Sequence, residues 1–121
     1  MSDAVVLVVA AGFALMGALA LVRPADVLSQ FGVAVETAEG TNEVRAVYGG
    51  FGLAVAALLA VAAVGDPSTR DGLIIATACA LAGMAAGRLF GAALERPRGV
   101  HPVWTYFAIE VVSACALVAA A

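Results

Sequence analysis

Four apolar segments, each long enough to cross a lipid bilayer, dominate this chain of 121 residues. They cover residues 4–22, 46–64, 73–94 and 103–121. A helix needs about 20 apolar residues to cross the hydrocarbon core. Only helices and closed barrels span membranes, and these segments lack the strict alternation of barrel strands. The sequence therefore predicts an all-α membrane protein, in which a single domain forms an antiparallel bundle of four transmembrane helices.

The composition excludes several other classes of protein. The chain is 64% hydrophobic and 12% charged, whereas soluble domains carry roughly 25% charged residues. A soluble domain of this length could not bury so much apolar surface. The net charge is -3 and the six basic residues are all arginine, so we expect no binding to nucleic acid. Asp3 stands where a signal peptide would be basic, which favours an uncleaved first helix.

The loop between the first two spans is longer than the others and contains a short amphipathic pattern. Pro24 can begin a helix and Gly32 can end it. Its two faces are apolar (Val27, Leu28, Phe31) and polar (Asp26, Ser29, Gln30). We expect a short interfacial helix that lies along the membrane surface. An irregular loop is the alternative, because the pattern is short.

Arginine positions predict the orientation of the bundle. The first and third loops carry Arg23, Arg45, Arg96 and Arg98, whereas the side with the second loop and both termini has only Arg70. Cytoplasmic loops carry an excess of basic residues. We therefore expect the first and third loops in the cytoplasm and both termini outside.

Small residues at helical spacing indicate where helices approach one another closely. The third span has a stripe of Gly83, Gly87 and Gly91, and the second span contains Gly49 and Gly52. Such residues allow close backbone contact in membranes. We expect packing within one bundle, and a homo-oligomer along the third-span stripe is the alternative.

The two cysteines, Cys79 and Cys115, lie in apolar segments without a metal-binding or disulfide pattern. We expect both to be small buried apolar residues that point away from any polar cluster.

Two charged residues inside the spans carry most of the functional information. Arg88 lies seven residues before Glu95, and Glu110 lies eight residues after Pro102. At 1.5 Å per residue, both charges are about 10–12 Å from the same end of consecutive antiparallel helices. Charged residues in a membrane usually face the bundle interior. The sequence predicts an Arg88–Glu110 ion pair, either direct or through a bound ligand or water.

Further polar residues are expected at the same membrane level, near the start of the second span and on the fourth. The predicted polar cluster consists of Asn42, Glu43, Arg45, Tyr48, Arg88, Tyr106 and Glu110. One interpretation is structural, since a buried ion pair fixes helix register. The other is a binding site for a headgroup or a proton. His101 lies in the nearby loop, and Trp104 fits the aromatic belt of the interface. We assign no catalytic residue, metal or cofactor.

The segment Asn42-Glu43-Val44-Arg45-Ala46-Val47-Tyr48-Gly49-Gly50 resembles the Glu/Asn-x-Arg-Ala-x-Tyr-Gly-Gly signature of the "domain of unknown function 4345" family. The positions of Pro24–Gly32, Gly87-Arg88 and Glu110 are also similar. The third loop departs from the family's shorter Asp-Gly-x-Pro pattern. The resemblance implies a small four-helix protein of the bacterial cytoplasmic membrane, and it implies no reaction.

Three functional hypotheses follow. The leading one is a non-enzymatic membrane protein that binds a small amphiphile, a membrane lipid or a membrane partner in the inner half of the bundle. Arg45 and Arg88 would hold an anionic group, Glu110 would balance the charge, and Tyr48 would donate a hydrogen bond. The second is a small proton-coupled transporter or channel in which Glu110 titrates. The third is a membrane enzyme acting on a lipid through Glu110, Tyr106 and His101.

Overall fold

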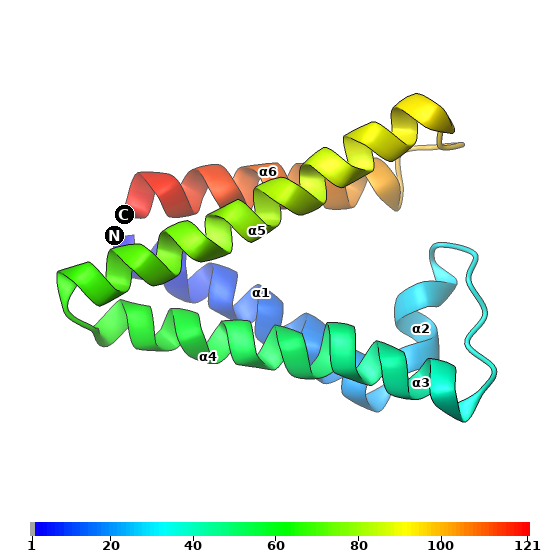
Figure 1. Cartoon of the computed structure of the whole chain (residues 1–121), viewed down its shortest axis with the longest axis horizontal. Coiled ribbons are helices and arrows are strands. Elements are labelled where there is room, and N and C mark those ends of the chain that lie inside the picture. Colours follow the sequence, from blue (N-terminus) through cyan, green and yellow to red (C-terminus); the bar gives the residue numbers. More distant parts are fainter. Residues whose placement is uncertain (1) are drawn as a thin grey trace.

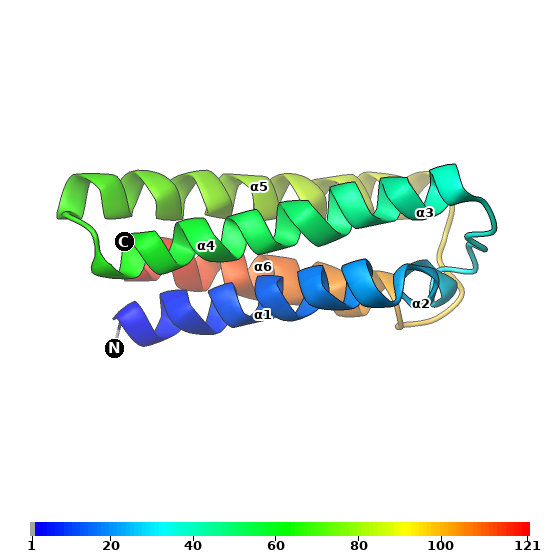
Figure 2. The same cartoon turned by 90° about the horizontal axis from the view of Figure 1, so that it is seen from below.

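The computed structural model describes residues 2–121, and long helices make up most of the chain. The elements are α1 (Ser2–Val22), α2 (Pro24–Ser29), α3 (Ala38–Val44), η1 (Arg45–Gly50), α4 (Phe51–Val64), α5 (Pro67–Leu94) and α6 (Val103–Ala120). α3, η1 and α4 follow one another without a break and form one helix of 27 residues. The four long helices run antiparallel, with α2 across one end (Figures 1 and 2). This confirms the predicted all-α fold with four spans.

The outer surface of the bundle is apolar, as a membrane requires. In each of the four spans only 22% of the most apolar 18-residue window is buried within the protein. Large side chains such as Val8, Leu15, Val61 and Val112 are more than half exposed. Lipid tails remove the cost of exposing these groups, because they are as apolar as the side chains. The chain is therefore a multi-pass membrane protein.

The second and third spans are longer than the apolar segments predicted. The helix 38–64 begins eight residues before the expected span, and α5 begins six residues earlier, at Pro67. α5 has 28 residues, about 42 Å at 1.5 Å per residue, which exceeds the roughly 30 Å hydrocarbon core. The polar ends of these helices thus extend beyond the apolar layer.

Asp66 begins α5 by accepting a hydrogen bond from the Thr69 N–H at 3.1 Å, which lowers the pKa of this carboxyl.

The helices form two pairs, α1 with α4 and α5 with α6. The pairs converge near the two termini and diverge toward the end where α2 lies (Figure 1). The buried apolar core joins both pairs in the converging half; its members are Val6, Ala10, Leu59, Ala62, Ile74, Ala78, Leu81, Ala114, Leu117 and Ala120. One half of the bundle is therefore sealed by apolar packing.

Arg70 links the chain segments that meet at this sealed end. Its Nη1 donates to the carbonyl of Ala120 at 2.8 Å, and its Nη2 is 3.3 Å from Oδ1 of Asp3. The side chain of Arg70 is only 14% exposed. Both termini and the turn before α5 therefore lie at one end, as predicted. The guanidinium of Arg70, from the first turn of α5, contacts both terminal segments.

Glycines allow α1 to approach the helix 38–64 closely. A Cβ atom on Gly17 would lie 2.8 Å from the carbonyl oxygen of Gly49 and 2.9 Å from the backbone N of Leu53. A Cβ atom on Gly52 would lie 3.0 Å from the carbonyl oxygen of Phe13. Backbone atoms cannot yield as side chains do, so this contact requires glycine at these positions. Gly49 and Gly52 do lie in a helix contact.

The prediction that the glycine stripe of α5 packs within the bundle is wrong. Gly83, Gly87 and Gly91 are exposed, and a Cβ atom on any of them would meet nothing within 4 Å. The packed face of α5 runs through Leu81 and Ala85. Gly83 and Gly87 each lie two residues beyond one of these buried positions, a rotation of about 200° around the helix, so the stripe that begins with them points away from the packed face.

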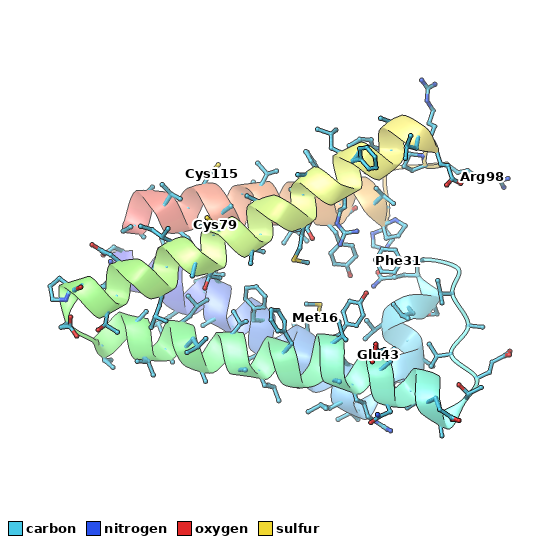
Figure 3. All side chains as sticks on the ribbon, viewed as in Figure 1. Met16, Phe31, Glu43, Cys79, Arg98 and Cys115 are labelled. Carbon is cyan, nitrogen blue, oxygen red and sulfur yellow. The ribbon has the colours of Figure 1, made fainter. Side chains whose placement is uncertain are left out.

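The expectation that both cysteines are buried is also wrong. Cys79 and Cys115 are free and exposed on the apolar surface. Figure 3 places both near the sealed half of the bundle, away from the α2 end. Cys79 follows the buried Ala78, and a one-residue step of about 100° turns its side chain out of the packed face. In a membrane protein an apolar side chain can contact either the protein interior or lipid, and both are apolar. Hydrophobicity alone therefore could not predict which of the two surrounds each cysteine.

Substituting alanine for Gly17 should lower stability, because its Cβ would overlap backbone atoms of the facing helix. We expect a loss of about 1–3 kcal/mol, the usual range for overpacking. Gly12→Ala is the matched control in the same helix, because a Cβ there meets nothing within 4 Å. Thermal unfolding in detergent, followed by circular dichroism, compares the two. Equal midpoints for both variants would contradict the assigned α1–α4 contact.

Candidate functional site

The centre of the site is an ion pair between α5 and α6. Nε of Arg88 donates to Oε1 of Glu110 at 2.7 Å. The Glu110 side chain is 5% exposed and that of Arg88 is 24% exposed. Leaving either charge unpaired in so apolar an environment would cost several kcal/mol. The structure thus contains the predicted pair, in its direct form.

Two aromatic rings cover the guanidinium of Arg88. Its Cζ lies 5.4 Å from the ring centre of Tyr106 and 5.9 Å from that of Phe31. The two rings contact each other, with centres 5.6 Å apart. Phe31 follows α2 and lies between that helix and the α5–α6 pair (Figure 3). A cation held over aromatic faces gains about 0.5–2 kcal/mol, so these rings help to fix the guanidinium.

Gln30 connects the α2 segment to α6. The hydroxyl of Tyr106 donates to Oε1 of Gln30 at 3.1 Å, and Nε2 of Gln30 donates to the Val27 carbonyl at 3.0 Å. The predicted short helix exists, from Pro24 to Ser29. Its polar face was predicted to include Gln30, but Gln30 turns toward the bundle. Gly32 has a positive φ of 74°, a conformation that favours glycine, and it reverses the chain three residues after the end of α2.

Sequence reasoning missed Gln30 and Phe31 as members of the site. The signal was present in part, because Gly32 marks the point where the chain reverses. Helical periodicity could not reveal the contact, since both residues follow the last residue of α2.

A pocket of about 270 Å³ opens beside these residues. It is lined by Gln30, Phe31, Pro97, Arg98, Gly99, His101, Pro102 and Val103. We call it the basic pocket, because its lining includes one arginine and one histidine and no carboxylate. His101 lies 3.3 Å from the Thr105 hydroxyl through Nδ1, and its ring centre is 6.2 Å from that of Tyr106. The third loop therefore lies next to the α2 segment at the divergent end.

The predicted cluster does not come together as a whole. Arg45 is exposed and its Nε donates to the Leu21 carbonyl at 2.9 Å, at the end of α1. Asn42 and Glu43 are exposed. The structure therefore does not bring Arg45 to Arg88, with which it was expected to hold an anionic group. Its position is explained by the last carbonyls of α1, which lack helical partners and attract a donor.

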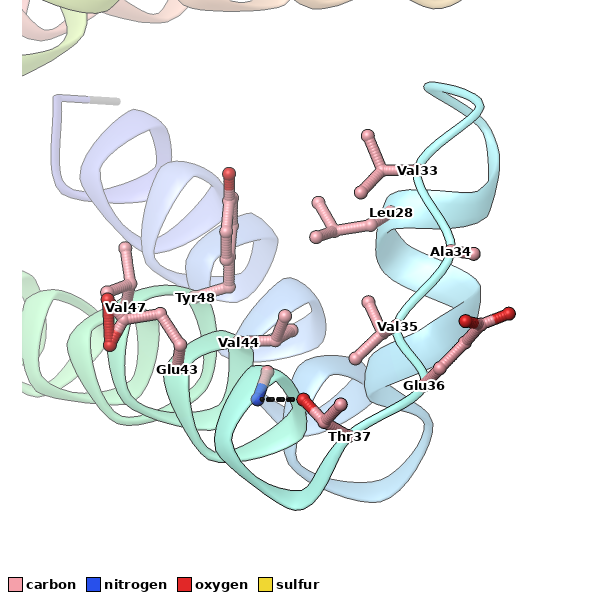
Figure 4. A pocket seen from close by; sticks show the side chains of 11 residues that line it. Leu28, Val33, Ala34, Val35, Glu36, Thr37, Glu43, Val44, Val47 and Tyr48 are labelled. Atoms are coloured by element: carbon pink, nitrogen blue, oxygen red, sulfur yellow. Dashed lines mark hydrogen bonds between the residues drawn. The ribbon is translucent and has the colours of Figure 1, made fainter.

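Tyr48 belongs to a stretch of π-helix, and this explains why the expected stripe breaks up. The element η1 covers Arg45–Gly50, and the N–H of Phe51 donates to the Ala46 carbonyl, five residues earlier. A wider turn changes the angular position of every following side chain relative to an α-helix. Tyr48 is half-buried, and Figure 4 shows its hydroxyl directed away from its own helix, toward the side where α5 and α6 run.

The geometry thus sorts the seven predicted residues into three groups. Arg88, Tyr106 and Glu110 form one contiguous site with Gln30 and Phe31. Tyr48 is directed toward the side where α5 and α6 run, whereas Asn42, Glu43 and Arg45 are exposed and take no part in these contacts. Among residues 2–121, no three His, Cys, Asp or Glu side chains gather closely enough to hold a metal ion.

Comparison with known proteins gives one match. The model of a family described as a domain of unknown function, DUF4345, matches residues 1–121. No curated protein and no solved structure matches the chain. The match covers every element of the site.

Removing one member of the ion pair should destabilise the protein more than removing both. We expect Arg88→Leu or Glu110→Leu to cost about 3–5 kcal/mol, since each leaves a buried charge unpaired, and the double variant to recover much of that loss. Chemical unfolding in detergent measures the cycle. Arg23 and Asp26, paired at 2.9 Å with both side chains more than 60% exposed, provide the control cycle, with a coupling below about 1 kcal/mol. Strict additivity at Arg88 and Glu110 would contradict the pairing.

Proposed function

The chain belongs to the DUF4345 family, and we propose that it binds a small amphiphile whose anionic headgroup contacts Arg88 and the basic pocket. This is a binding function without catalysis. The observation that carries it is the incomplete pairing of the Arg88 guanidinium. An arginine has five N–H donors, and within residues 2–121 its hydrogen bond to Glu110 uses Nε alone.

The remaining donors of Arg88 are well placed for an anion. Glu110 and the rings of Phe31 and Tyr106 hold the guanidinium in position. A preorganised guanidinium binds carboxylate or phosphate oxygens in a forked geometry, which makes arginine the usual residue for such recognition. Because Glu110 is already paired, it offsets the charge of Arg88 and leaves the outward edge of the guanidinium for a ligand.

The basic pocket supports the choice of an anionic headgroup. Arg98 and His101 line it together with Gln30 and Phe31, which also contact the Arg88 site. A headgroup there would meet Arg98 at the membrane surface, and an oxygen reaching past Phe31 would meet Arg88. Tyr48, on the facing helix pair, would supply a hydroxyl donor. The arginine excess at this end favours the cytoplasmic leaflet of a bacterial inner membrane, with both termini outside.

The geometry favours binding over transport. The sealed half of the bundle lies beyond the site, at the end opposite to α2. Four of its apolar side chains are fully buried: Val6, Leu59, Ile74 and Leu117. A proton or ion that crossed this half of the bundle would lose its hydration, and these apolar side chains offer it no polar partner. Enzymatic use of the same residues is also disfavoured, because the Tyr106 hydroxyl is bonded to Gln30 and the Glu110 carboxylate to Arg88.

Neutralising Arg88 should weaken the binding of an anionic lipid. We expect Arg88→Gln to lower retention of phosphatidylglycerol at least about tenfold relative to wild type, as one charge-assisted contact predicts. Phosphatidylcholine should be retained weakly by both proteins. Native mass spectrometry of the protein released from mixed-lipid nanodiscs measures the adducts.

Arg23→Gln is the matched control, because Arg23 lies at the same end of the bundle but pairs with Asp26 on the surface. It should leave the adducts unchanged. A folded Arg88→Gln protein that retains phosphatidylglycerol as wild type does would overturn the proposal. So would equal losses in both variants, which would indicate a general effect of surface charge.

A further inference from the structure

The segment 24–32, which consists of α2 and the three residues after it, buries little of its own surface. Pro24 is the one buried residue among the six of α2. The Ser29 hydroxyl donates a hydrogen bond to the Asp26 carbonyl at 3.0 Å, so this polar contact lies within the segment. A contact of this kind stays intact when the segment moves as a unit. The position of the segment therefore depends on the residues at its end.

Two residues after α2 attach the segment to the α5–α6 pair. Oε1 of Gln30 accepts a hydrogen bond from the Tyr106 hydroxyl, and the ring of Phe31 contacts both the Tyr106 ring and the Arg88 guanidinium. Among residues 2–121, the Gln30 bond is the one side-chain hydrogen bond between this segment and the α5–α6 pair. Local opening costs least where few contacts are lost. One hydrogen bond and one aromatic ring thus keep the segment in place.

The backbone leaves helical geometry on both sides of the segment. Arg23, between α1 and α2, has a φ of -132° and a ψ of 63°, and Gly32 has a φ of 74°. A Cβ atom on Gly32 would meet nothing within 4 Å, so no neighbour restricts this turn. Hinges are formed by a few residues at the ends of elements, which absorb changes in φ and ψ. The segment can therefore pivot at either end.

The same contacts lie across the route from the basic pocket to Arg88. Gln30 and Phe31 line the basic pocket, and the ring centre of Phe31 is also 5.9 Å from Cζ of Arg88. The Arg88 side chain is only 24% exposed. A headgroup in the pocket therefore meets Phe31 before it meets the guanidinium. The Phe31 ring and a bound anion compete for the space beside Arg88.

We infer that Gln30 and Phe31 form a latch over the Arg88 site, and that the segment 24–32 moves away from α6 when an anionic headgroup binds. This inference rests on the proposed function. The Tyr106 hydroxyl holds the latch closed, and in the open state the remaining N–H donors of Arg88 meet the headgroup. The apparent affinity is the intrinsic affinity reduced by the fraction of open protein. The latch therefore regulates how readily the site takes up a lipid, and weakening it strengthens binding.

Two substitutions, called the latch variants, weaken the closed state in different ways. Tyr106→Phe removes the hydrogen bond to Gln30 and keeps an aromatic ring beside Arg88. Retention of phosphatidylglycerol should rise about threefold to tenfold, as one neutral hydrogen bond predicts. Gly32→Ala should act similarly, because alanine is strained at a φ of 74° and the open segment can release that strain. Native mass spectrometry of protein released from mixed-lipid nanodiscs measures retention.

Gly12→Ala is the matched control for these variants. A Cβ atom on Gly12 would meet nothing within 4 Å, as at Gly32, but its φ is not positive. The substitution lies within α1 and outside the segment 24–32. We expect it to leave retention of phosphatidylglycerol unchanged.

Opening is also measured in the absence of an anionic lipid. Nitroxide labels on Ser29→Cys and Val112→Cys, both exposed positions, report the distance from the segment to α6 by double electron–electron resonance. Cys79 and Cys115, which are free and exposed, are replaced by alanine. In phosphatidylcholine nanodiscs we expect one main distance in otherwise wild-type protein and an added, different distance in both latch variants. Phosphatidylglycerol should add that second distance without a latch substitution.

Retention that is unchanged or lower in either latch variant would overturn the inference. A single distance in every protein and lipid would also overturn it, because the segment would then not move. The proposed function fails by a different result, which is wild-type retention of phosphatidylglycerol in Arg88→Gln. Loss of retention in Arg88→Gln without a gain in the latch variants would overturn the latch alone.

Discussion

The pairing of one guanidinium with one carboxylate inside the membrane determines how the divergent half of this bundle is built. Neither Arg88 nor Glu110 could stay charged there alone, so α5 and α6 must keep the register that brings them to 2.7 Å. Once fixed, the guanidinium supplies a surface for the rings of Phe31 and Tyr106. The Tyr106 hydroxyl then has a partner in Gln30. A chain of polar and aromatic contacts thus links the α5–α6 pair to the segment that leaves α1.

The two ends of the bundle are held by different forces. Around the termini, apolar residues from all four long helices pack together, and Arg70 joins three segments. At the α2 end, the contacts between the helix pairs are polar or aromatic and come from a short segment. Local opening costs least where few apolar side chains are buried. The end that carries the basic pocket is therefore the end better able to admit a ligand, and the sealed end keeps the pairs aligned.

Depth along a helix could be predicted from the sequence, whereas rotation about it was predicted less well. Arg88 and Glu110 were found because helical rise is constant and the connecting loop is short. The glycines of α5 were assigned to the wrong face, because spacing alone does not say which side meets protein and which meets lipid. Gln30 and Phe31 lie beyond the last residue of α2, where no periodicity applies. In a membrane, the apolar contrast that orients helices of soluble proteins is missing.

The segment that resembles the family signature is also the segment that departs from α-helical geometry. Arg-Ala-Val-Tyr-Gly-Gly, residues 45–50, is the whole of η1. Within one wide turn, Arg45 reaches back to the end of α1, Gly49 packs on Leu21 of the same helix, and Tyr48 faces the opposite helix pair. A regular helix would turn Arg45 and Tyr48 only about 60° apart. The motif therefore has a structural role in the π-helical turn. Arg45 and Gly49 contact the end of α1, and the Tyr48 hydroxyl is directed toward the side on which the Arg88 site lies.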